Sequence, residues 1–190
     1  MTTHTGTHRL VITRSALAAA EQVASSRLPR ETGGILIGVR VGSDVYVADV
    51  SEVADDQSTG RRFVLREAAR EEALARYRFD VPVDCLFGYV GTWHSHPALT
   101  AGSSRDIKTL RYEAKDCHDL VAMMILMRAA DGVWLVDGAV GHRKQVIAHR
   151  AGRPAWRSII AGADVIVRPA GQPTPPGCGM PDGAGSEGST

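Results

Sequence analysis

The spacing of apolar and polar residues predicts strands and helices that alternate along most of the chain. Residues 9–13 form a short apolar run typical of a strand, and residues 14–28 have the period of a helix. The predicted helix would bury a stripe of small and apolar side chains, Leu17, Ala20, Ala24 and Leu28. Pro29 should end it, because the residue before a proline avoids helical backbone.

Two β-rich runs at 34–40 and 44–50 follow, and a short turn with Gly42 lies between them. This pattern predicts a hairpin. The polar stretch 51–64 should be irregular. Residues 66–79 should form a helix whose interleaved arginines and glutamates face solvent.

The segment 85–93 is an apolar run of strand length that leads directly into His94-Ser95-His96-Pro97. A central strand has to end at Pro97, because proline cannot donate to the ladder. In a regular strand, Trp93 would face away from the two histidines and into the core. A helix over 103–115 should then begin at Ser103.

The remaining apolar segments complete an α/β (α+β) fold, in which a mixed sheet is combined with helices. Strands are predicted at 120–127 and 132–138, with Asp131-Gly132 as a hairpin turn, and an edge strand near 144–149. A further apolar segment occupies 156–167. We expect one domain over residues 1–168, followed by a disordered tail at 169–190 that is rich in glycine, proline and small polar residues.

Composition and charge narrow the classes of function. The 190 residues suffice for one domain with a substantial core, and the formal charge of +1 gives no general attraction to nucleic acid or anionic membranes. Cys85, Cys117 and Cys178 are widely spaced and include no CxxC pair, which suits a reducing compartment. No apolar run is long enough to span a bilayer. We therefore expect a cytoplasmic protein without nucleic-acid or membrane partners.

Two histidines follow the apolar strand at a spacing that suits a metal ion. Side chains two residues apart in a strand point to the same face, so His94 and His96 should project together. Zn²⁺ favours imidazole nitrogen at roughly 2.0–2.1 Å. Asp106, in the first turn of the next helix, could supply a third ligand if the loop 98–102 folds back. Three protein ligands leave a fourth position open for water, as in catalytic zinc sites.

Hydrolysis at such a site also needs a base and a hydrogen-bond donor. Glu31 is the candidate general base, because it lies at the junction of the first helix and the next strand, where Gly33 and Gly34 permit close backbone approach. Ser103 is the candidate donor to the oxyanion of a tetrahedral intermediate.

Each of these residues also has an ordinary structural interpretation. An isolated pair of histidines in a strand is weak evidence of a metal site, and a glutamate beside glycine is most often solvated. Ser103 and Asp106 also have the spacing of a serine cap and an acid at a helix start, which is compatible with catalysis. The prediction depends on the conjunction of ETGG, HSHP and SxxD in this order.

Together these segments resemble the JAMM (MPN-plus) metalloprotease motif in its prokaryotic form. The matching residues are Glu31 to Gly38 (ETGGILIG), Gly91 to Pro97 (GTWHSHP) and Ser103 to Asp106 (SSRD). The resemblance extends in element order over residues 9–150. It implies the cytidine-deaminase-like JAB/MPN fold, in which helices flank a mixed, mainly antiparallel curved sheet.

In one respect the chain departs from the family pattern, because the segment between His96 and Ser103 is one residue shorter than usual. With Ser104 as the family serine, Ile107 would take the position of the aspartate, and isoleucine cannot bind a metal. We therefore keep Asp106 as the ligand. Whether Ser103 or Ser104 assists the intermediate stays open.

The resemblance also implies roles and an activity. In this family the residues that correspond to His94, His96 and Asp106 bind zinc, the residue at Glu31 is the base, and the residue at Ser103 assists the intermediate. The implied reaction is hydrolysis after the C-terminal glycine of a ubiquitin-like protein, usually of an isopeptide bond to lysine.

Two alternatives are weighed beside this function. One is a processing peptidase that matures a ubiquitin-like or sulfur-carrier precursor. The other is a catalytically silent MPN scaffold, which the presence of Glu31 and all three ligand residues argues against.

Overall fold

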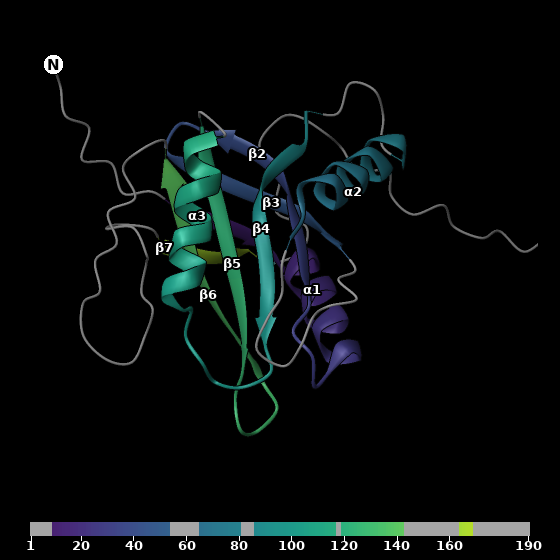
Figure 1. Ribbon diagram of the computed structural model, residues 1–190, viewed down its shortest axis with the longest axis vertical. Helices are drawn as coiled ribbons and strands as arrows, with labels where there is room; N and C mark the ends of the chain where they lie inside the picture. Colours follow the sequence, from purple (N-terminus) through teal and green to yellow (C-terminus); the bar gives the residue numbers. More distant parts are fainter. Residues whose placement is uncertain (1–8, 54–64, 81–85, 117–118, 143–163, 169–190) are drawn as a thin grey trace, which may run out of the picture.

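The computed structural model describes residues 9–53, 65–80, 86–116, 119–142 and 164–168. Their helices and strands follow one another along the chain (Figure 1) as β1 (Arg9–Thr13), α1 (Arg14–Arg27), β2 (Gly33–Val41), β3 (Asp44–Glu52), α2 (Glu67–Asp80), β4 (Gly88–His96), α3 (Ser104–Asp116), β5 (Leu120–Arg128), β6 (Trp134–His142) and β7 (Asp164–Arg168).

The strands of the described residues form one mixed sheet in the order β6-β5-β4-β2-β3-β1-β7. The pairs β5–β6, β2–β4 and β2–β3 are antiparallel. The pairs β4–β5, β1–β3 and β1–β7 are parallel. Strand β6 also approaches β1 and β7, so the sheet curves until its edge strands come near each other. A curved mixed sheet with flanking helices confirms the predicted fold class.

Strand β4 lies inside the sheet, and both of its faces are covered. On one face, α1 packs over a core that contains Leu36, Trp93 and Met124. On the other face, α3 packs over Ile125 and its neighbours, and α2 packs over Ile35 and its neighbours. In the view of Figure 1, α3 lies to the left and α2 to the right of β4. A strand covered on both faces requires a nearly continuous apolar sequence, which explains the run that leads to the histidines.

Helix α1 buries part of the predicted stripe, because Ala20 and Ala24 are fully buried as predicted but Leu17 and Leu28 are not. Its fully buried residues are Ala16, Ala20 and Ala24, whereas Leu17 only packs at the side of the core. Leu28 is the C-cap and is 36% exposed. The prediction for Leu28 was wrong because the helix ends one residue earlier. A stripe of alanines lets the helix axis approach the sheet closely.

Helices α2 and α3 match the predicted segments 66–79 and 103–115 to within one residue at each end. The β2–β3 hairpin also matches its prediction, and Gly42 adopts a positive φ of 60° in its turn. Strand β3 continues to Glu52, so the first residues of the predicted irregular stretch belong to the sheet.

Strand β6 starts later and ends later than the predicted strand 132–138. The turn before it includes Gly132, at a φ of 87°, and an Asp131 side chain that accepts a hydrogen bond from the Val133 N–H at 3.0 Å. Pairing with β5 then continues to His142. Gly141 lies within the strand and pairs with Val121. A Cβ there would lie 2.8 Å from the Ala114 Cβ, so the glycine lets α3 pack closely.

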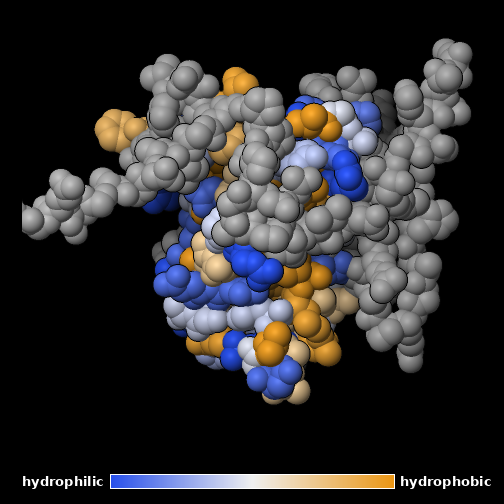
Figure 2. Space-filling view, turned by 180° about the vertical axis from the view of Figure 1, so that it is seen from behind, coloured by the Kyte–Doolittle hydropathy of each residue, from blue (hydrophilic) through white to orange (hydrophobic). Residues whose placement is uncertain are grey.

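The predicted edge strand at 144–149 and the tail at 169–190 lie outside the described residues. The last part of the predicted apolar segment 156–167 belongs to β7, which pairs with β1. Seen from behind in Figure 2, the described surface is a mosaic of hydrophilic and hydrophobic patches. Among the described helices, none combines the length and the apolar character needed to cross a membrane.

Candidate metal centre

The two histidines lie at the carboxyl end of β4, on the face that α3 and α2 cover. His94 and His96 are buried, with exposed fractions of 8% and 7%. Trp93 is fully buried in the opposite core, as alternation in a strand predicts. Strand β4 ends at His96, directly before Pro97. The predicted end of the strand and the common direction of the two imidazoles are therefore confirmed.

The loop after β4 orients the second histidine. His96 Nδ1 lies 2.5 Å from the carbonyl oxygen of Thr100. A carbonyl can only accept, so Nδ1 is the donor in this contact, and Nε2 is left to face the other side of the ring. That Nε2 atom lies 3.1 Å from His94 Nε2. A backbone carbonyl that fixes the tautomer in this way is the usual partner of a metal-binding histidine.

The start of α3 brings the aspartate to the histidines. The Ser103 hydroxyl accepts hydrogen bonds from Arg105 N at 3.2 Å and Asp106 N at 3.4 Å, which makes Ser103 the predicted cap. In return, Asp106 Oδ2 accepts a hydrogen bond from Ser103 N. This contact leaves Oδ1 directed at His94 Nε2, at a distance of 3.4 Å.

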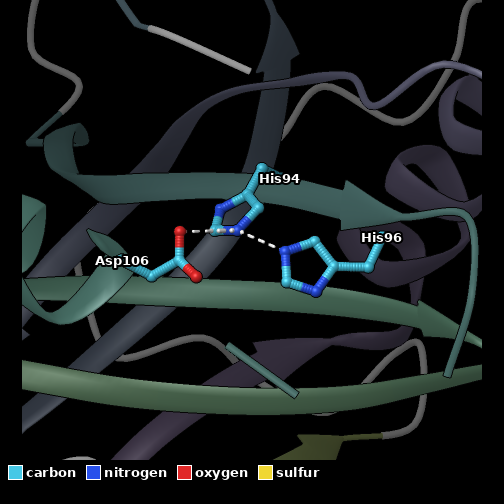
Figure 3. Close-up of side chains that lie close together, drawn as sticks. All are labelled: His94, His96 and Asp106. Atoms are coloured by element: carbon cyan, nitrogen blue, oxygen red, sulfur yellow. Dashed lines mark hydrogen bonds and ion pairs between the residues drawn. The ribbon is translucent and has the colours of Figure 1, made fainter. Parts of the chain in front are cut away.

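The three side chains converge as Figure 3 shows, with His94 between Asp106 and His96. One ligand atom from each lies within 4.8 Å of the other two. Ligand atoms held at roughly 2.0–2.1 Å by a tetrahedral ion are about 3.3–3.4 Å apart. The distances of 3.1 and 3.4 Å from His94 fit this spacing. Two imidazole nitrogens and one carboxylate oxygen are also a donor set that Zn²⁺ accepts, so the group could hold a metal ion.

Burial keeps the first histidine in the form that a metal requires. Burial is the main cause that lowers the pKa of His94 to about 4. The charge of His96 adds to this effect, and the Asp106 carboxylate opposes it. A metal ligand must be neutral imidazole. His94 is therefore neutral at pH 7 without any metal.

Glu31 lies beside this group because the start of β2 is tied to the end of β4. Thr32 N donates to the Ser95 hydroxyl at 3.1 Å, and Ser95 N donates to Thr32 O at 2.8 Å. Gly33 is the register partner of His94. Glu31, directly before Thr32, is only 8% exposed. Segments that are more than sixty residues apart in the sequence thus meet at one point.

A cavity of about 780 Å³ joins all the predicted site residues: Glu31, His94, His96, Ser103 and Asp106 all line it. Of the two serines that the sequence left open, Ser103 lines the cavity, whereas Ser104 is not among its lining residues. The Ser103 hydroxyl accepts from the helix backbone, and its own proton stays available for donation.

The cavity residues that were not identified from the sequence include Thr92, Thr100 and Glu113. Thr92 and Glu113 could have been found from periodicity. Thr92 lies two residues before His94 on the same strand face, and Glu113 lies seven residues after Asp106 on the same helix face. Thr100 acts through its backbone carbonyl, which leaves no signal in the side-chain pattern.

The sequence is similar to that of known proteins over the part of the chain that contains these residues. The family model that describes prokaryotic homologues of the JAB domain matches residues 13–142. Among solved structures, the solution structure of protein DSY2949 from Desulfitobacterium hafniense is similar at a TM-score of 0.49 and 22% identity, over 68% of this chain and 88% of that one. No curated protein matches the sequence. The family match includes Glu31, both histidines and Asp106, and it covers more than half of the chain. The chain therefore belongs to the family of prokaryotic homologues of the JAB domain.

Proposed function

We propose that this protein is a zinc-dependent peptidase that hydrolyses the bond after the C-terminal glycine of a ubiquitin-like protein, as an isopeptidase that removes it from conjugates. The observation that supports the proposal most is the convergence of two histidines and an aspartate beside a buried glutamate in one cavity. Membership in the JAB-domain family supports the class of reaction. We place the reaction in the cytoplasm, as the cysteine usage suggests.

In this proposal, His94, His96 and Asp106 hold the ion. A bound Zn²⁺ would polarise the scissile carbonyl and lower the pKa of water. Glu31 lines the same cavity without belonging to the group of three, the position that a general base needs. It takes the proton from the attacking water and passes it to the leaving amine as the carbon–nitrogen bond breaks.

Ser103, which lines the same cavity, would assist at the reacting carbonyl. Its hydroxyl can donate to the oxyanion while its oxygen still caps α3. The capping bonds fix the side chain, so little order has to be gained when substrate binds. The helix cap and the proposed catalytic role are therefore compatible in one residue.

The proposal is tested with a fusion of a ubiquitin-like protein to a reporter that follows its terminal Gly-Gly. The zinc-loaded protein should cleave after the second glycine, a chelator should abolish cleavage, and added zinc should restore it. If the protein recognises a diglycine terminus, alanine in place of the last glycine should slow cleavage at least roughly tenfold, because the added Cβ has to be accommodated where the glycine binds.

Equal cleavage of the alanine substrate would rule out recognition of a diglycine terminus. A zinc-loaded protein that binds the ubiquitin-like partner but leaves both the fusion and an isopeptide conjugate intact would instead support the silent scaffold.

A further inference from the structure

Glu113 lines the same cavity as the candidate metal centre, but it lies at the other end. Asp106, Thr109 and Glu113 follow one another at helical spacing along one face of α3, and all three line the cavity. Seven residues of helix advance by about 10 Å. The backbone of Glu113 thus lies about 10 Å along the helix from that of Asp106, so we look for its role in what else the cavity binds.

Two hydroxyl groups of β4 orient the Glu113 carboxyl group. The Tyr89 hydroxyl donates to Glu113 Oε2 at 3.2 Å, and the Thr92 hydroxyl lies 3.5 Å from the same oxygen. The other oxygen, Oε1, accepts no hydrogen bond from the described residues. Within the described part of the chain both contacts reach Oε2, so Oε1 is the oxygen that a ligand in the cavity would meet.

The electrostatic surroundings favour a positive ligand. Burial raises the pKa of Glu113 to about 7, although the Tyr89 hydrogen bond, the charge of Arg70 and the Thr92 hydrogen bond all lower it. Arg70 itself packs over the Tyr89 ring at 5.2 Å and pairs with Glu67 at 3.3 Å. The negative charge of Glu113 is therefore incompletely compensated, and a cation in the cavity would stabilise it.

We propose that Glu113, with the hydroxyls of Tyr89 and Thr92, forms a specificity subsite for a lysine or arginine side chain of the substrate. The proposal rests on the peptidase function above. An extended peptide advances about 3.3 Å per residue, so a span of about 10 Å places the basic residue within three residues of the hydrolysed bond. The cavity of about 780 Å³ has room for such a segment.

Binding is tested without any cleavage, with Nα-acetyl-lysine methylamide as the probe and Nα-acetyl-norleucine methylamide as its neutral counterpart. Each is titrated into the full-length protein while backbone amide signals are followed by NMR. The lysine probe should shift the signals of Thr92, Thr109 and Glu113 in a saturable manner. The norleucine probe should not, because its side chain ends in a methyl group.

Glu113→Gln should weaken binding of the lysine probe at least about tenfold, because the amide cannot supply the charge in a charge-assisted hydrogen bond. Glu72→Gln is the matched control. It removes the same charge from the exposed surface of α2 and should leave binding unchanged. Equal binding of the two probes, or undiminished lysine binding by Glu113→Gln, would overturn the subsite.

Cleavage then separates this proposal from the function on which it rests. In substrates with lysine or norleucine near the hydrolysed bond, the preference for lysine in kcat/KM should fall at least about tenfold in Glu113→Gln. Cleavage with no such fall refutes the subsite and leaves the peptidase. Saturable lysine binding that depends on Glu113, in a protein that cleaves none of these substrates, supports the subsite and refutes the peptidase.

Discussion

The side chains of the candidate metal site are oriented by backbone groups around them. His96 donates to the Thr100 carbonyl, and Asp106 accepts from the Ser103 N–H. Both contacts lie on the side of the ligand that faces away from His94, so they fix the ligand without occupying the atom that would bind the ion. The arrangement is largely formed before a metal arrives, which reduces the ordering that binding requires.

Asp137 is a buried carboxyl group, and its surroundings lead to a prediction about stability and pH. It is 5% exposed, its Oδ1 accepts from the Gly138 N–H at 2.8 Å, and its Oδ2 has no hydrogen-bond partner among the described residues. Burial raises the pKa of Asp137 to about 7, although the hydrogen bond from Gly138 opposes this. The folded protein therefore holds a proton that the unfolded chain releases near pH 4.

The consequence is a loss of stability as the pH rises. Below about pH 4, Asp137 is protonated in both the folded and the unfolded protein. Between about pH 4 and 7 it ionises only in the unfolded chain, so the free energy of unfolding falls as the pH rises. Above about pH 7 this loss of stability is complete. Asp137→Asn stays neutral, so in the metal-free protein its Tm should exceed that of the parent at pH 8 by at least roughly 2–4 °C. The difference should shrink toward pH 4. A Tm difference that is the same at pH 4 and pH 8 would show that Asp137 is not held neutral.

At the scale of elements, the glycines of ETGGILIG explain how β2 fits between its neighbours. A Cβ at Gly34 would lie 1.9 Å from the Ser51 carbonyl oxygen, and a Cβ at Gly38 would lie 1.8 Å from that of Tyr46. Both oxygens belong to the backbone of β3, which cannot move aside alone. The two glycines therefore let β2 pass close to β3 just after the turn that presents Glu31.

Gly34→Ala should consequently destabilise the protein by about 1–3 kcal/mol and shift β2 away from β3. Because β2 also pairs with the histidine strand, the variant should lose activity as well. Gly88→Ala is the control, since a Cβ at that strand position has no neighbour within 4 Å. Thermal unfolding of the two variants measures the difference. A Gly34→Ala protein as stable as Gly88→Ala would mean that β2 and β3 are not packed this closely.

Most helices and strands could be predicted from the sequence, because hydrophobic periodicity and the residues that begin or end an element depend on local sequence. Pro97 ended β4, and Ser103 capped α3, where the pattern placed them. The errors arose where packing between elements decides. Leu28 was exposed because α1 ended one residue earlier, and β6 continued past Gly138 and Gly141 because pairing with β5 outweighs the weak preference of glycine for strands.

At the scale of the whole molecule, the order of strands creates the site. The pairing of β2 with β4 brings Glu31 to the histidines, and the crossover from β4 through α3 to the parallel strand β5 lays Asp106 over them. The residues of the site were predicted from their order in the sequence and from the resemblance to a known motif. The cavity and its far end at Glu113 could not be, since they depend on how α3 packs over the sheet.

The most direct test of the account measures zinc content and cleavage in Glu31→Gln beside Asp106→Asn. Glu31→Gln should keep about one zinc per chain and lose activity roughly 10²–10⁴-fold, since the amide fills the same space but accepts no proton. Asp106→Asn should lose zinc, because a neutral amide is a poorer ligand for a dication than a carboxylate. Loss of zinc from Glu31→Gln, or nearly full activity with zinc retained in that variant, would contradict the division between base and ligands proposed here.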